Sequence, residues 1–95
     1  MLVASAVKLK IEKTGKEVVL CGVRHGDCFR QLEALGFEPR KGYEEIEQGF
    51  VDNYGVFRNR NQALLHAVQC GQLNADMRGQ YRRGEKKTLY SEDLW

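Results

Sequence analysis

The sequence predicts a small α+β domain, in which two antiparallel hairpins form one sheet and two helices cover a single face of it. Three observations indicate this fold: alternation of apolar and charged residues over positions 3–11, turn chemistry between two pairs of apolar segments, and two stretches with helical spacing. A chain of 95 residues forms a single domain, residues 1–95, with a thin core. Because so small a domain offers little concave surface, we expect it to be oligomeric.

The first 23 residues form the first predicted hairpin. Residues 3–11 alternate between apolar and charged side chains, which is the pattern of a strand with one solvated face. Residues 13–16 supply a turn. Residues 17–23 are apolar on both faces, so we predict that this second strand lies in the centre of the sheet.

The first predicted helix spans residues 28–35. Its apolar residues keep helical spacing: Cys28, Phe29, Leu32 and Leu35. Gly36 follows at the position where a left-handed cap is favoured, and Asp27 precedes the helix as a capping residue.

A charged loop over residues 38–45 leads to the second predicted hairpin. Segments 48–51 and 56–58 flank Asp52-Asn53-Tyr54-Gly55, which has the composition of a tight turn. A second helix then begins after Asn59, which can cap it.

The second helix is expected to end at Gly71, and the remaining chain has weaker signals. We expect residues 74–87 to be a mobile basic segment. Residues 88–91 are compatible with a late strand, and the chain then reaches its only tryptophan, Trp95.

The overall charge is nearly balanced. Fifteen basic and 13 acidic residues give a net charge of +2, which is too weak to predict nucleic-acid binding by charge alone. Positive charge is concentrated in residues 78–87, which contain a single acid and five basic residues: Arg78, Arg82, Arg83, Lys86 and Lys87. Such an arm is most often a solvated linker.

The cysteine count and the hydropathy pattern indicate a soluble cytosolic protein. Cys21, Cys28 and Cys70 cannot all pair in disulfides. No apolar stretch approaches the ~20 residues that a membrane span needs, and no secretory signal is present, so we expect no membrane partner.

The segment Arg24-His25-Gly26-Asp27-Cys28 places a cation, an imidazole, a carboxylate and a thiol in five positions. A helix N-terminus next to Arg24 and His25 attracts anions. A strand followed by Arg-His-Gly also resembles the opening motif of the histidine phosphatase superfamily. That superfamily needs a second histidine, and the only other one, His66, lies within the second predicted helix.

Two further chemistries are compatible with this segment. Cys28 at the first turn of a helix is a possible nucleophile, but its spacing with Leu32 favours packing under the helix. Zinc would take four ligands, yet Cys21, His25, Cys28 and Cys70 lack the paired spacing of a zinc site. We therefore assign no catalytic residue, metal or cofactor.

Binding is the least demanding use of these residues. Arg24 and His25 offer donors to a phosphate, and Asp27 either orients a donor or caps the helix. The second hairpin adds aromatic rings for a base and further cations, of which the main candidates are Phe50, Phe57 and Arg60. The alternative role for Phe50 and Phe57 is simple core packing.

Four segments together resemble a family of small phage proteins of Thoeris anti-defence, which sequester cyclic ADP-ribose signalling nucleotides. These segments are residues 21–28, residues 47–60 with Gly49-Phe50-Val51 and Gly55-Val56-Phe57, the Gly71-Gln72-Leu73 stretch, and Tyr90-Ser91-Glu92-Asp93-Leu94-Trp95.

The resemblance implies a homodimer or higher oligomer, acting in the host bacterial cytoplasm, that holds a cyclic nucleotide between subunits and releases it unchanged. It also implies ligand contacts from the C-terminal basic arm, here Arg82 and Arg83. Such a protein is not an enzyme. The alternative class is a protein-directed phage inhibitor such as an anti-CRISPR, which would use its surface and the acidic C-terminal residues to engage a partner.

Overall fold

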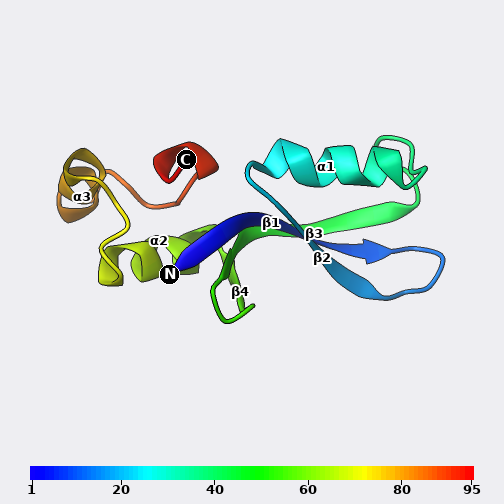
Figure 1. The fold of residues 1–95 in the computed structure, drawn as a ribbon, viewed down its shortest axis with the longest axis horizontal. Helices are drawn as coiled ribbons and strands as arrows, with labels where there is room; N and C mark the ends of the chain where they lie inside the picture. The colour runs from blue at the N-terminus through cyan, green and yellow to red at the C-terminus, as the bar shows by residue number, and fades with distance from the viewer.

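The computed structural model describes residues 1–95 and contains a four-stranded antiparallel sheet with strand order β2-β1-β3-β4 (Figure 1). The strands are β1 (Leu2–Ile11), β2 (Glu17–Gly22), β3 (Tyr43–Asp52) and β4 (Phe57–Asn59). The predicted α+β class and both hairpins are confirmed. The central position predicted for the second strand is wrong, because β2 pairs only with β1 and forms one edge of the sheet.

Three α-helices and one short 3-10 turn complete the fold: α1 (His25–Ala34), α2 (Arg60–Gln69), α3 (Ala75–Arg82) and η1 (Ser91–Asp93). Helix α1 begins at His25, earlier than predicted, because Asp27 caps it from inside the first turn. The Asp27 carboxylate accepts a hydrogen bond from the Arg24 N–H at 2.9 Å. Gly36 has φ +96°, as expected for a left-handed cap.

Helices α1 and α2 lie on the same face of the sheet. Ser5 and Phe50 are directly opposite each other in the β1–β3 ladder, so Phe50 shares a face with Val7 and Leu9. Under α1, this face forms a small core of Val7, Leu9, Cys28 and Leu32. The molecule is elongated, 44 × 21 × 20 Å, with α1 at one end and α2 and α3 at the other (Figure 1).

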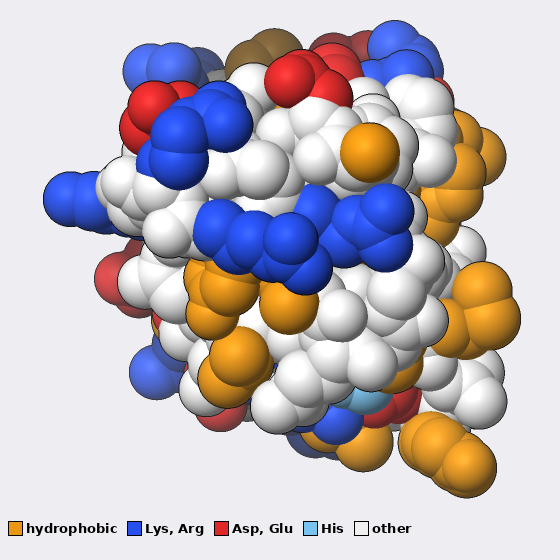
Figure 2. Space-filling view, turned by 90° about the vertical axis from the view of Figure 1, so that its left-hand side faces the viewer, with side chains coloured by type: hydrophobic (Ala, Val, Ile, Leu, Met, Phe, Trp, Pro, Cys, Tyr) orange, Lys and Arg blue, Asp and Glu red, His pale blue; other side chains and the backbone are white.

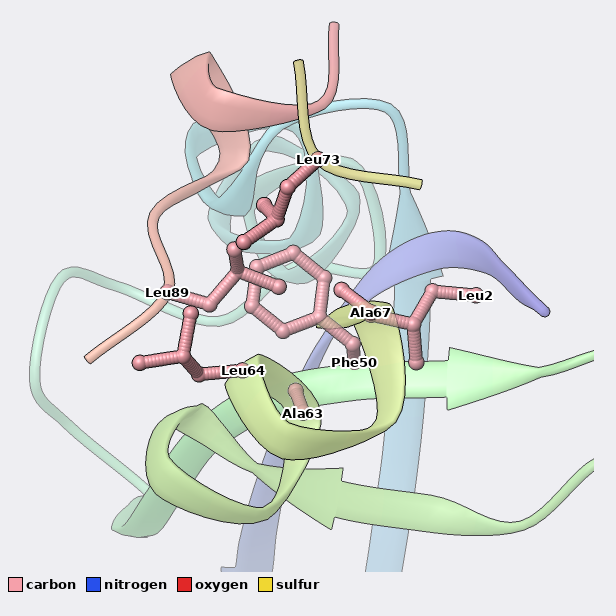
Figure 3. Close-up of a cluster of buried hydrophobic side chains, with 7 residues drawn as sticks. All are labelled: Leu2, Phe50, Ala63, Leu64, Ala67, Leu73 and Leu89. Atoms are coloured by element: carbon pink, nitrogen blue, oxygen red, sulfur yellow. The ribbon is translucent and has the colours of Figure 1, made fainter. Parts of the chain in front are cut away.

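A second and larger core lies under α2. Its buried side chains come from the sheet, α2 and the segments after it (Figure 3): Leu2, Phe50, Ala63, Leu64, Ala67, Leu73 and Leu89. Figure 3 shows the Phe50 ring in the middle of this group. The C-terminal residues are therefore part of the fold, because Leu89 is fully buried in this core.

The opposite face of the sheet carries no helix. Phe57 pairs with Val51 and points to this face, where its ring crosses Gly49. A Cβ at Gly49 would lie 2.1 Å from the Arg58 carbonyl oxygen and 2.8 Å from the Phe57 ring, so only glycine fits there. The Lys8 ammonium lies 4.7 Å from the centroid of the same ring.

The second hairpin and its neighbour helix follow their local signals. The turn at residues 52–55 is confirmed, with an Asp52 N–H to Val56 carbonyl bond of 3.1 Å and Gly55 at φ +79°. Asn59 caps α2, because its side chain accepts a hydrogen bond from the Gln62 N–H at 2.8 Å. The predicted loop over residues 38–45 is too long, since β3 already begins at Tyr43.

The C-terminal third is more ordered in secondary structure than its polar composition indicates. Helix α3 forms within residues 74–87, capped by the Asn74 side chain, which accepts from the Met77 N–H at 2.8 Å. The mobility expected for this segment stays a prediction. The late strand expected at residues 88–91 is absent, since these residues pack against α2 without joining the sheet. None of the helices has the length and apolar character that a membrane crossing requires.

Candidate anion-binding site

Two helix N-termini meet above strand β3. Arg24 and His25 start α1, and Arg60 is the first residue of α2. One Arg60 Nη atom lies 3.5 Å from His25 Nδ1 and 2.7 Å from Gln48 Oε1. The fold therefore brings His25 and Arg60, which are distant in sequence, into one cluster.

His25 is buried, with 9% of its surface exposed. Its Nε2 lies 2.8 Å from the Gly49 carbonyl oxygen, which can only accept, so Nε2 carries the proton and Nδ1 is free to accept from Arg60. Burial lowers the pKa of His25 below its ordinary value, and the Arg60 charge adds to this shift, while the bond to Gly49 opposes it in part. The imidazole is therefore neutral at pH 7, and both of its nitrogens are engaged.

Arg60 holds the C-terminal part of the chain. Its other Nη atom donates to the Leu89 carbonyl oxygen at 2.8 Å, and the Arg60 carbonyl accepts from the Leu89 N–H at 3.2 Å. The guanidinium carbon lies 4.9 Å from the centroid of the Tyr90 ring, a cation–π contact. The Lys86 ammonium lies at the same distance from this ring and pairs with Asp93 at 2.5 Å.

Arg24 also binds the C-terminal segment. Its guanidinium donates to the main-chain oxygen of Trp95 and lies 3.8 Å from the Glu92 carboxylate. The Arg24 and Glu92 side chains are 42% and 73% exposed, so this pair is open to solvent. Asp27 takes no part in the cluster, because it caps α1 and pairs with Arg30; the bond from the Arg24 N–H lowers the pKa of Asp27.

The aromatic rings near the cluster differ from those proposed from the sequence. Phe50 is fully buried, with its ring 5.3 Å from His25 in an edge-on contact and 6.2 Å from Trp95. Phe57 lies on the opposite face of the sheet. The partly exposed rings at the cluster are Tyr90 and Trp95, at 49% and 38%. Sequence reasoning missed Tyr90, although an acidic and aromatic segment at 90–95 is complementary to two arginines.

Arg82 and Arg83 lie apart from this cluster at the end of α3. Arg83 forms a two-point ion pair with Glu85, at 3.0 and 3.1 Å, and no hydrogen bond or ion pair joins either arginine to Arg24 or Arg60. Figure 2 shows Lys and Arg side chains side by side in a band across the end of the molecule that carries α3.

The surroundings of the cysteines favour neither a nucleophile nor a metal site. Cys28 is buried, with its Sγ 3.4 Å from the Leu20 carbonyl oxygen, and burial raises its pKa to about 11. The thiol is therefore protonated at neutral pH and is a poor nucleophile. Cys70 is exposed and contacts His66 at 3.5 Å, and no three His, Cys, Asp or Glu side chains converge as a metal site.

These features define a small α+β protein with a cationic cluster that is covered by its own C-terminal segment. The chain belongs to the phage T4 y16D protein family, whose model, described as Phage T4 y16D protein, matches residues 1–95. No curated protein and no solved structure matches the chain. Membership of a phage protein family, which the resemblance implied, is confirmed; nucleotide sequestration is taken up below as a proposal.

Proposed function

We propose that this phage protein captures a cyclic nucleotide immune signal in the host bacterial cytoplasm and leaves it intact. The ligand class is a cyclic ADP-ribose isomer or a cyclic oligonucleotide. One observation carries the proposal: Arg24 and Arg60 direct their donors at oxygen atoms of the same C-terminal segment, from Leu89 and Trp95. Phosphate oxygens are acceptors of the same kind with a full charge, so they can replace these partners.

The energetics of capture are compatible with this cluster. A stoichiometric sponge for a signal below micromolar concentration needs about −10 to −12 kcal/mol of binding free energy. Each hydrogen bond to a charged group supplies about 1.5–3 kcal/mol and each stacked base about 1–3 kcal/mol. Displacing the solvent-exposed Arg24–Glu92 pair costs at most about 1 kcal/mol. The bonds that Arg24 and Arg60 make to the Trp95 and Leu89 oxygens cost about 1.5–3 kcal/mol each, which the phosphate contacts must offset. Tyr90 and Trp95 replace Phe50 and Phe57 as our candidates for stacking.

The side chains support capture and not turnover. His25 has both ring nitrogens engaged by Gly49 and Arg60, so it has no free nitrogen for a phosphoryl group. Cys28 is buried and protonated. We therefore propose that the protein is not an enzyme.

A second copy of the chain is part of the proposal. The Arg24 side chain is 42% exposed, and Val23, which precedes it in the chain, is 61% exposed. Val3 on β1 is also exposed, at 51%. A homodimer or higher oligomer would cover these side chains and supply the missing wall of a nucleotide pocket.

Isothermal titration with cyclic ADP-ribose isomers and cyclic di- and trinucleotides tests this proposal. We expect tight binding of at least one of them, and chromatography should return it unchanged. Arg24→Ala should weaken binding at least tenfold, whereas Arg30→Ala, on the same helix but paired only with Asp27, should stay within twofold. Absence of any binding would overturn the proposal, and an altered ligand would make the cluster an active site.

The alternative is a protein-directed phage inhibitor such as an anti-CRISPR, and a specific observation favours it. Strand β3 has a long unpaired edge, to which another protein can bind. An inhibitor would bind no nucleotide and would lose activity when its contact surface is changed.

A further inference from the structure

The outer edge of β3 is unpaired over its first half. Strand β3 has ten residues, but β4 pairs only with Gly49, Phe50 and Val51. No main-chain or side-chain hydrogen bond outside the β1 ladder reaches the main chain of residues 44–48. In an antiparallel strand, alternate residues direct N–H and C=O groups to the free side. The β1–β3 register shifts at Ile46, so the unused donors and acceptors form two short runs, one on each side of this residue.

A groove of about 550 Å³ runs between this edge and α1. Its apolar lining consists of Phe29, Leu32, Phe37 and Tyr43, of which the Phe37 and Tyr43 rings meet edge to face at 6.0 Å. This volume accommodates a large apolar side chain and its neighbours.

A second hollow of about 390 Å³ extends the groove along the edge. It lies where β4 ends, and Asn59, Arg60 and Asn61 line it on that side. Glu45 and Gln48 line both hollows, so the two adjoin along β3. Asparagine side chains can pair with a main chain that runs past them, because each offers both a donor and an acceptor.

The charge of the groove is acidic. Glu33, Glu38 and Glu45 line it against a single basic side chain, Arg40. Glu38 pairs with Lys41 at 3.1 Å, but neither Glu33 nor Glu45 has an ion-pair partner. These uncompensated carboxylates favour a cationic occupant.

The carboxylates on the other face of β3 lie next to basic side chains of β1. Glu44 and Glu47 lie opposite Lys10 and Lys8 in the β1 ladder. The carboxylates that have no lysine opposite them, Glu33 and Glu45, therefore line the groove, and Glu47 borders the second hollow.

We propose that residues 43–48 of β3 bind an extended, basic segment of a partner protein as a fifth strand, with one apolar side chain inserted into the groove. Main-chain hydrogen bonds along the edge supply affinity, and the groove and its carboxylates supply selectivity. Pairing with β3 of a second copy would place like charges opposite each other, which disfavours self-association at this edge. The second hollow borders the cationic cluster through Gln48 and Arg60, but the proposal requires no bound nucleotide.

The test uses a fluorescent peptide that alternates lysine and valine around a central phenylalanine, and a matched peptide with glutamate in place of lysine. Anisotropy should show binding of the lysine peptide only. Amide hydrogen exchange should slow in residues 43–48 and stay unchanged in β2, the other sheet edge. The double variant Glu33→Lys with Glu45→Lys should lose at least tenfold in affinity and gain binding of the glutamate peptide.

Glu17→Lys is the matched control, because Glu17 is an exposed carboxylate on the opposite edge strand. It should change the affinity less than twofold, and thermal unfolding should confirm that each variant is folded. Should the double variant fail to fold, Glu45→Gln replaces it, because it keeps the side-chain shape. Its affinity for the lysine peptide should be about threefold lower than that of the wild type. Failure of the lysine peptide to bind, protection in β2, or equal losses in Glu17→Lys would each overturn the proposal.

Discussion

Replacing Phe50 tests whether this residue stabilises the core or stacks on a ligand base. Its side chain has no exposed surface and lies in the middle of the larger core, in contact with α2 and the C-terminal segments (Figure 3). Truncation of a buried phenylalanine to alanine costs about 3–5 kcal/mol. A domain of this length has an unfolding free energy of about 5–14 kcal/mol, so Phe50→Ala should remove about a fifth of it or more.

The second candidate ring provides the comparison. Phe57 is half-buried on the helix-free face, so Phe57→Ala should cost about 1–2 kcal/mol. For a domain of up to 100 residues, each kcal/mol lowers Tm by about 4–8 °C. Phe50→Ala should therefore lower Tm by at least about 12 °C, and Phe57→Ala by less.

Urea unfolding followed by circular dichroism at 25 °C measures both losses. Phe50→Leu provides a milder variant, should Phe50→Ala be too unstable to purify, and should still lose more stability than Phe57→Leu. A loss below about 1 kcal/mol for Phe50→Ala, or equal losses for the two alanine variants, would refute the core position of Phe50. Either result would make it a candidate for stacking on a base again.

Three further predictions concern titration and reactivity. Burial lowers the pKa of His25 in the folded protein, whereas a histidine in the unfolded chain has a pKa of about 6.5. Below this pH the unfolded chain therefore binds more protons than the folded protein. Stability should thus fall as pH drops below about 6.5, and His25→Gln should flatten that part of the urea-midpoint profile. The Asp52 carboxylate accepts hydrogen bonds from the main-chain N–H groups of Tyr54 and Val56 and from the Arg58 side chain. The bond from the Val56 N–H is the largest cause of its lowered pKa. Its stabilising effect is present above about pH 4 and lost in more acidic solution, so Asp52→Asn should be less stable at pH 7 with a shallower acid transition. Cys28 should resist a thiol reagent in the native protein, whereas the exposed Cys21 and Cys70 react.

A specific experimental result would contradict each of these predictions. His66 also has a lowered pKa, so His66→Gln is the control, and an unchanged profile in His25→Gln would show that His25 is not the responsible group. An Asp52→Asn protein as stable as the wild type at pH 7 would mean that the turn does not need the carboxylate. Three fast-reacting thiols in the native protein would place Cys28 outside the core.

Local signals predicted the parts of the fold that depend on neighbouring residues. The turn at residues 52–55, the Asn59 cap and the Gly36 cap were correct, since their hydrogen bonds and backbone angles involve residues within a few positions. Helix α3 was missed, because it is polar and buries no residue fully, so it lacks the apolar stripe that identifies a helix.

Strand order was the main error in the fold. The apolar run of residues 17–23 indicated a central strand, but apolar composition does not identify the neighbours of a strand. Only Val18 and Leu20 of β2 pack against the core under α1, and Val19 stays exposed at 40%. The helix-free face thus accepts apolar residues that have no partner within the protein.

The candidate site divides in the same way. The run from Arg24 to Cys28 predicted a helix start, because a helix N-terminus and its first side chains are adjacent in sequence. Anion binding at this position stays a prediction. The partners of these residues came from packing. Arg60 reaches His25 across 35 positions, and Trp95 reaches Arg24 across 71. Contacts between residues so far apart in the sequence depend on how the sheet and the helices pack together. The sequence patterns therefore indicated the cationic residues, and only the tertiary structure showed that the C-terminal segment covers them.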